Sequence, residues 1–261
     1  GKLTVWLFTF STAVLLTQGF IQLGWLDVST SRQLSQRGSL SGALIGGAMF
    51  GVGMVLARCC SSRLLVLAAQ GNLRALLSGL VFAVTAQSAL SGLLSPLRAT
   101  IAGWWTVEGG AARDLLALTG VSHGGALLFG AVWLVAALVW ARRQQVRFWG
   151  GFGAIGVGVM VASAWLLTWK ISSQAFDLVV PVQSLSFTGP AADMLMLVLS
   201  PPGQPLKFDL GLVPGVAAGA FLSALLWREL KLEGFQGGQA MRRYIVGAIL
   251  MGFGGMLAGG C

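Results

Sequence analysis

The chain has 261 residues, of which 56% are hydrophobic and only 10% are charged, and its mean hydropathy is +0.80. About 25% of the residues of a soluble domain are charged, so this composition excludes a cytosolic enzyme, a nucleic-acid reader and a disordered chain. The apolar residues run continuously rather than alternating, which argues against a β-barrel and predicts an all-α integral membrane protein.

The net charge of +9 results from 17 lysine and arginine residues, most of them in the polar connections, against 8 aspartate and glutamate residues. Cations placed in this way follow the positive-inside rule, and no basic run is interleaved with aromatic residues as a nucleic-acid site would require. We therefore expect a multi-pass protein of the cell inner membrane, with the lipid bilayer as a partner and no nucleic acid. The 38 glycines predict helices that pack closely or open around a site.

Crossing the hydrocarbon core of a membrane takes roughly 20 helical residues. Five apolar stretches are close to this length: Leu3–Trp25, Ala75–Ser95, Gly124–Ala141, Gly150–Trp169 and Leu210–Trp227. Two further apolar segments, Leu40–Ala57 and Tyr244–Cys261, are rich in glycine and run into cysteine. The sequence thus predicts a multi-span helical bundle with two unusual glycine-rich elements.

A break is predicted soon after Leu40–Ala57. Beyond Cys60 the chain has a polar run and then only six apolar residues, Leu64–Ala69, before the polar segment Gln70–Arg74. Six residues cannot span hydrocarbon, so 40–74 is predicted to be a discontinuous or re-entrant element, a helix followed by a turn and a short helix. Irregular backbone at membrane depth needs protein or a water-filled cavity around it, as at a substrate site.

Basic loops set the predicted topology, with both of the following groups on the cytoplasmic side. The first group is Arg142, Arg143 and Arg147, and the second is Arg228, Lys231, Arg242 and Arg243. The connections Pro96–His123 and Lys170–Asp209 then face outward. Within the second connection, Ala191–Leu199 is predicted to be a short interfacial or re-entrant helix.

An internal repeat appears when the sequence is shifted by 201 residues, which aligns Gly46–Cys60 with Gly247–Cys261. Six of the fifteen positions are identical and read G-x(4)-G-x-G-x-x-L-A-x-x-C. We interpret 40–74 and 244–261 as repeat elements, the second incomplete, within one polytopic domain over 1–261, and expect the native chain to extend past one or both ends. An inverted repeat would bring the two cysteine-bearing ends together.

The repeated cysteines, Cys60 and Cys261, are the first candidates for function. The glycines near these cysteines are predicted to shape a substrate path, and they are Gly51, Gly53, Gly252 and Gly254. Cys59 is a weaker candidate because its repeat equivalent is Gly260. The alternative is that the thiols are small buried hydrophobic groups and that the glycines serve only helix packing. The pairs and triplets Gly42/Gly46, Gly47/Gly51 and Gly211/Gly215/Gly219 have the spacing for that packing.

These glycine-cysteine segments resemble the YeeE/YedE family of sulfur-compound transporters. The specific similarity lies in Gly51–Arg63, Gly71–Arg74 and Met251–Cys261, while the order of apolar segments is similar over most of the chain. This chain departs from the family in having Cys59 where glycine is usual and in lacking an upstream cysteine-bearing segment. The resemblance implies a transporter and not an enzyme, without a cofactor or metal.

The substrate that the resemblance implies is a sulfur oxyanion, thiosulfate, passed along the thiols of Cys60 and Cys261. Thiosulfate is a dianion with a soft terminal sulfur, and a thiol is a weak hydrogen-bond donor that can contact it and release it. A soluble sulfur-carrier protein or a larger membrane complex is a further candidate partner.

Several polar residues near the thiols are candidates for the same path. Ser61 follows Cys60, and Arg63 and Arg74 flank the short helix, where they would draw anions toward it. Arg58 interrupts the apolar run directly before the cysteines, and an ionisable group at such a place is a site hypothesis. The alternative is that these arginines reach the headgroups and set topology.

Two motifs are rejected as functional. Gly151, Gly153 and Gly156 match GxGxxG but lie inside an apolar span, so helix packing explains them better than a dinucleotide site. His123, the only histidine, has no ligand partners nearby in sequence.

Two other functions remain as alternatives to transport. One is a transport-inactive structural subunit of a larger membrane assembly. The other is a membrane thiol enzyme using Cys59 and Cys60, which is disfavoured because no neighbouring His, Asp or Glu would activate a thiolate.

Overall fold

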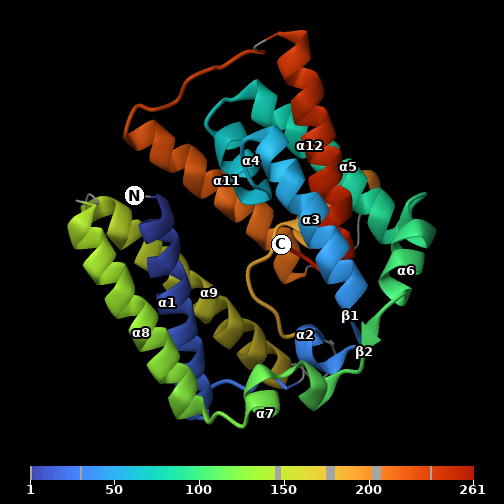
Figure 1. The fold of residues 1–261 in the computed structure, drawn as a ribbon. Helices are drawn as coiled ribbons and strands as arrows, with labels where there is room; N and C mark the ends of the chain where they lie inside the picture. Colours follow the sequence, from blue (N-terminus) through green and yellow to red (C-terminus); the bar gives the residue numbers. More distant parts are fainter. Residues whose placement is uncertain (1, 30, 145–147, 175–179, 202–206, 236) are drawn as a thin grey trace. The chain divides into compact units, whose positions relative to one another are not determined.

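A computed structural model describes residues 2–29, 31–144, 148–174, 180–201, 207–235 and 237–261, and they are helical along most of their length (Figure 1). Arg147, one of the predicted cytoplasmic cations, lies outside the described residues. The chain forms two compact units, one of Gly1–Gly38 with Val107–Leu185 and the other of Ser39–Thr106 with Ser186–Cys261. We call them unit 1 and unit 2. The two-residue strands β1 (Gly38–Ser39) and β2 (Thr106–Val107) lie where the chain passes from one unit to the other.

Unit 1 is built around three long helices, with α1 packed against α8 and α9. Small residues allow the close approach, since a Cβ added to Gly158 of α9 would lie 2.8 Å from the carbonyl oxygen of Thr9 in α1. The hydroxyl of Thr9 donates a hydrogen bond to the carbonyl of Ala154 at 3.0 Å. The helices of this unit are α1 (Lys2–Gln22), α2 (Arg32–Ser35), η1 (Gly110–Arg113), α7 (Leu115–Thr119), α8 (His123–Arg143) and α9 (Phe148–Gln174).

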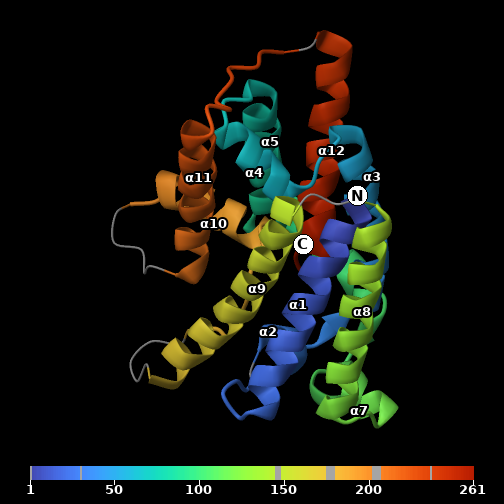
Figure 2. The same cartoon turned by 90° about the vertical axis from the view of Figure 1, so that its left-hand side faces the viewer.

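Unit 2 contains both cysteine-bearing segments. Its helices are α3 (Leu40–Ala57), α4 (Ser61–Ala69), α5 (Leu73–Ser91), α6 (Ser95–Gly103), α10 (Thr188–Leu199), α11 (Phe208–Leu226) and α12 (Gly238–Leu257). α12 lies along α3 and α5 (Figure 1), and α11 packs against α4 and α10 (Figure 2). The core of the unit is formed where α3, α4, α5 and α12 meet.

The all-α membrane fold predicted from composition is confirmed. Six helical segments of the described chain are long and apolar enough to cross a membrane. Five of them correspond to the five predicted spans, and the sixth is Leu40–Ala69. The GxGxxG motif at Gly151–Gly156 lies inside α9, as predicted, but its glycines meet no neighbouring backbone among the described residues: an added Cβ on Gly151 lies 4.0 Å from the Phe8 ring, and one on Gly153 or Gly156 has no neighbour within 4 Å. The short helix predicted at Ala191–Leu199 begins three residues earlier than expected, at Thr188.

The break after α3 is present and has a local cause. Arg58 closes α3 in the left-handed conformation, with φ 57°, and its backbone N–H bonds to the carbonyl of Val55. Residues in this conformation cannot continue a right-handed helix. Cys60 is extended and serves as the N-cap of α4, which begins at Ser61. The re-entrant character of this element stays a prediction.

The far end of α4 is fixed by the connection between α11 and α12. Asn72 caps α5 by accepting a hydrogen bond from the N–H of Ala75 at 2.8 Å, and its side-chain amide donates to the carboxylate of Glu233. Three backbone bonds join the same segments, from Leu73 N–H to the Glu233 carbonyl, from Lys231 N–H to the Gln70 carbonyl and from Glu233 N–H to the Gly71 carbonyl. Backbone and side-chain hydrogen bonds therefore both fix the α4–α5 turn to the connection between α11 and α12.

The helices α3 and α12 pack in opposite directions through their glycines. A Cβ added to Gly46 would lie 2.5 Å from the Gly254 carbonyl oxygen, and one added to Gly53 would lie 2.7 Å from the Gly247 carbonyl oxygen. Gly46 and Gly53 are the repeat equivalents of Gly247 and Gly254, so each pair of contacts is reciprocal. Only glycine permits backbones to approach so closely.

The packing predicted for the other glycine stripes is not observed. Among the described residues, no atom outside the local helix backbone lies within 4 Å of a Cβ added to Gly47 or Gly51, nor to any residue of the triplet Gly211/Gly215/Gly219. The spacing of small residues was the same in all these stripes, and the structure brings a neighbouring backbone to only one of them, Gly42/Gly46.

Candidate functional site

Cys60 occupies the start of α4. Its backbone is extended, with φ −87° and ψ 171°, and its side chain makes no capping hydrogen bond to the helix. The sulfur lies 3.3 Å from the hydroxyl of Ser62 and is half-buried. The first turn of α4 therefore keeps backbone N–H groups that the cap does not satisfy.

Cys261 reaches the same place from the end of α12. Two residues with positive φ, Gly259 at 90° and Gly260 at 131°, turn the chain after the helix, and Gly260 N–H bonds to the Gly255 carbonyl at 2.8 Å. The sulfur of Cys261 then accepts a hydrogen bond from the hydroxyl of Ser61 at 3.4 Å. The cysteine-bearing ends of two antiparallel helices thus meet, because each end folds back after its helix.

A third segment completes the contact. The backbone N–H of Phe187 donates to the sulfur of Cys261 at 3.3 Å. Phe187 is the N-cap of α10 and, like Cys60, it makes no side-chain capping bond. The sulfur of Cys261 therefore accepts from the beginnings of two helices, α4 and α10. Helix N-termini carry partial positive charge and unpaired N–H groups, which favour an anion.

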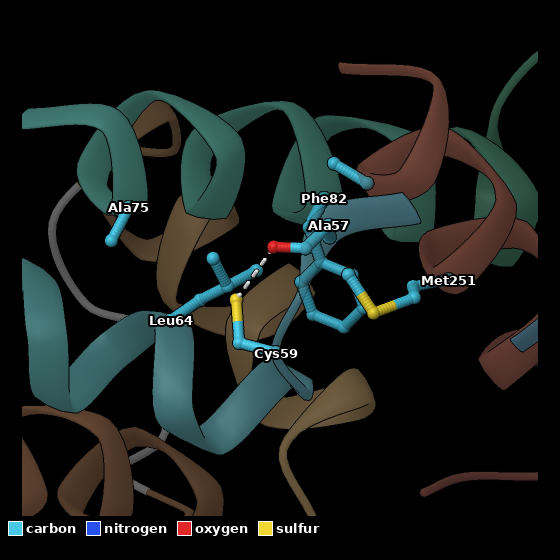
Figure 3. Packing of buried hydrophobic residues seen from close by; sticks show 7 residues of the cluster. Ala57, Cys59, Leu64, Ala75, Phe82 and Met251 are labelled. Carbon is cyan, nitrogen blue, oxygen red and sulfur yellow. Dashed lines mark hydrogen bonds between the residues drawn. The ribbon is translucent and has the colours of Figure 1, made fainter. Parts of the chain in front are cut away.

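Cys59 has a different environment from its neighbour. Its side chain is buried among Leu64, Phe82 and Met251, and its thiol donates to the carbonyl of Ala57 at 3.2 Å (Figure 3). A thiol in such a place acts as a small core residue.

The four predicted path glycines have helix-packing roles or no contact. Gly53 and Gly254 hold α3 and α12 together, and a Cβ on Gly252 would lie 2.7 Å from the carbonyl oxygen of Phe82 in α5. In the part of the chain that the structure describes, Gly51 has no neighbouring atom within 4 Å of an added Cβ. Three of the glycines thus place α12, and with it Cys261, by permitting close packing.

The three arginines lie in three different settings. Arg58 and Arg63 are exposed, Arg58 at the left-handed turn and Arg63 in the first turn of α4. Arg74 is half-buried, and its guanidinium carbon lies 4.5 Å from the centre of the Tyr244 ring. Arg74 thus makes a cation–π contact between α5 and α12.

Sequence reasoning missed the contribution of α10. The predicted residues that the structure brings together are Cys60, Ser61 and Cys261, and to these it adds Phe187. Phe187 acts through its backbone N–H, which every residue other than proline has, so no side-chain pattern could mark it.

Comparison with known proteins gives consistent matches. A protein-family model described as sulphur transport matches residues 1–261. The Thiosulfate transporter TsuA of Escherichia coli (strain K12) is 26% identical over 237 residues, which cover 84% of this chain and 64% of that protein. The protein of the same name from Spirochaeta thermophila is 24% identical over 242 residues, which cover 85% of this chain and 68% of that protein. The chain thus spans about two thirds of the length of these relatives.

Proposed function

The chain belongs to the sulphur-transport family, as its resemblance to YeeE/YedE proteins predicted, and from this premise we propose that it imports thiosulfate across the cell inner membrane. The names of the two relatives support thiosulfate as the substrate. Neither relative is named as a structural subunit, so the transport-inactive alternative is not favoured.

The observation that carries the proposal is the setting of the Cys261 sulfur. It accepts hydrogen bonds from Ser61 and from the N–H of Phe187, at the beginnings of two helices. An anion can take the place of that sulfur as the acceptor of both bonds. Because the sulfur accepts these two bonds, its own S–H proton is available to donate to the passing ligand.

This arrangement suits an anion that must bind and then leave. A lysine or arginine side chain held at the same place would retain a dianion strongly, whereas hydroxyl, thiol and backbone N–H donors stabilise it more weakly. The exposed Arg63, in the first turn of α4, adds positive charge that attracts an anion toward this helix end.

In the proposed path, Cys261 and Cys60 are successive stations. Ser61 connects them, since its hydroxyl bonds to Cys261 and its backbone follows that of Cys60. The ligand moves from one thiol to the other by exchanging hydrogen bonds, and no covalent bond is formed. Cys59 has no part in the path, because its thiol is buried in the core and bonded to Ala57.

The reciprocal glycine contacts support the proposal that 40–74 and 244–261 form an inverted repeat. Gly46 meets Gly254, and Gly53 meets Gly247, as expected for two copies related by a two-fold axis across the helix pair. Two such copies enter the membrane from opposite sides, which lets their cysteine-bearing ends converge. We propose that both units belong to one polytopic membrane domain.

The test is uptake of radiolabelled thiosulfate into proteoliposomes containing the purified protein. We expect Cys60→Ala and Cys261→Ala to abolish uptake while the protein stays folded, since removing a small thiol changes packing little. Cys59→Ala is the matched control and should keep most of the uptake. Normal uptake by both Cys60→Ala and Cys261→Ala would refute the thiol path, and absence of uptake by the unmodified protein would refute thiosulfate transport.

A further inference from the structure

The hydroxyl of Thr188 is buried without a partner. Thr188 is 0% exposed, and within the described part of the chain its Oγ1 has no hydrogen-bond partner. Buried hydroxyl groups are nearly always hydrogen-bonded, because leaving one unpaired is costly. An unpaired hydroxyl therefore needs a reason.

The position of Thr188 in its helix explains why the hydroxyl is free. Buried threonines inside helices bond to a carbonyl of the preceding turn, as Thr85 does to Val81 at 2.8 Å and Thr168 does to Ala164 at 2.9 Å. Thr188 is the first residue of α10, so no preceding turn exists to accept its proton. It also does not cap the helix, since the N-cap position belongs to Phe187.

The chain around Thr188 contacts the segment that carries Cys261 at two points. Thr188 directly follows Phe187, whose N–H donates to the sulfur of Cys261. Its Oγ1 is the atom nearest to a Cβ added at Gly255, at 2.9 Å, and the carbonyl of Gly255 holds the turn that leads to Cys261. Glycine at this position lets the Thr188 side chain pack directly against the backbone of α12.

We propose that Thr188 Oγ1 donates a hydrogen bond to an oxygen of the sulfur oxyanion while the terminal sulfur of that anion is at Cys261. The inference rests on the proposed function and deepens it, because it divides the two ends of the ligand between two kinds of donor. The thiol contacts the soft sulfur, and the hydroxyl and N–H at the start of α10 contact the hard oxygens. The site is therefore selective for anions that carry oxygen, and hydrosulfide, which has none, gains nothing from Thr188.

The test is thiosulfate binding to the full chain in detergent, measured by titration calorimetry. Thr188→Val keeps the shape of the side chain and removes the hydroxyl, so we expect its Kd to rise about tenfold, as for the loss of one hydrogen bond to an anion. The variants Thr188→Ser and Thr188→Ala form a second pair that differs only in the hydroxyl. The serine variant should bind thiosulfate at least several times more tightly than the alanine variant. The Kd for hydrosulfide should be the same in the unmodified protein and in these three variants.

Thr4 supplies a matched control. It is also 0% exposed with an Oγ1 that has no partner in the described chain, but it belongs to α1 in unit 1. Thr4→Val should leave the Kd for thiosulfate unchanged within about twofold, because no ligand contact is lost.

Each result either supports or overturns the inference. It is overturned when Thr188→Val binds thiosulfate as tightly as the unmodified protein and Thr188→Ala as tightly as Thr188→Ser. It is also overturned when Thr4→Val weakens thiosulfate binding as much as Thr188→Val does, or when the unmodified protein binds no thiosulfate. Binding that depends on Thr188 without uptake into proteoliposomes would overturn the transport proposal and leave this site standing. Uptake by the unmodified protein together with hydroxyl-independent binding would overturn this inference alone.

Discussion

Replacing Gly46 by alanine tests whether the glycine contact between α3 and α12 holds unit 2 together. Gly46 is buried against α12, and a Cβ at this position would lie 2.5 Å from the carbonyl oxygen of Gly254 and 2.6 Å from the backbone nitrogen of Ala258. Both are backbone atoms, so no side-chain rotation relieves the overlap.

The size of the effect follows from these distances. Ordinary contact begins near 3.4 Å, so α3 and α12 must separate by about 0.9 Å where they cross. Forcing extra atoms into a packed contact costs about 1–3 kcal/mol, and the better helix propensity of alanine returns up to about 1 kcal/mol. Comparison with a glycine of the same helix that has free space removes the propensity contribution.

Gly47→Ala is that comparison, because Gly47 is exposed and no described residue of another element lies within 4 Å of an added Cβ. Thermal unfolding in detergent, followed by tryptophan fluorescence, should give a Tm for Gly46→Ala lower than for Gly47→Ala by about 2–12 °C, using roughly 2–4 °C for each kcal/mol. Equal unfolding temperatures for the two variants would show that the close approach of α3 and α12 does not stabilise the protein.

Three further predictions concern the surroundings of the site. Asn72→Ala removes the cap of α5 and the bond to Glu233, so the free energy of unfolding should fall by about 1–2 kcal/mol in denaturant titrations, and an unchanged midpoint would contradict this role. Arg74→Leu loses the contact with the Tyr244 ring, so the free energy of unfolding measured by calorimetry should fall by about 0.5–2 kcal/mol. In a protein that already carries Tyr244→Leu, the same substitution should cause no such fall, because the contact is already absent. A cysteine introduced at the exposed Ser35 should react with an impermeant thiol reagent in intact cells, above the labelling of the unmodified protein, if the repeat is inverted; protection until the membrane is opened would establish a parallel repeat.

The membrane fold and the break at the cysteines could be predicted from the sequence because both depend on local properties. The number of apolar residues in a row decides whether a helix can span hydrocarbon, and Leu64–Ala69 is too short for any fold to change that. The pattern that we interpret as a repeat, from Gly46 to Cys60 and from Gly247 to Cys261, is also local, but the repeat itself stays a prediction.

The choice among similar residues could not be predicted. Cys59 and Cys60 are adjacent, yet one thiol is buried in the core and the other lies at the start of α4. Gly46 and Gly47 are adjacent as well, and only Gly46 meets another backbone. Such differences depend on which side of an element a neighbour covers, and that neighbour is supplied by a distant part of the chain.

The sequence by itself determined a helical membrane protein whose glycine-rich helices end in thiols. Only the tertiary structure brought Ser61 to Cys261, 200 residues away, and added the N–H of Phe187 and the unpaired hydroxyl of Thr188. The physical reason is that backbone N–H groups are alike in nearly every residue and a threonine hydroxyl is ordinary in a helix. They become parts of a site only where helix beginnings from separate segments face the same point.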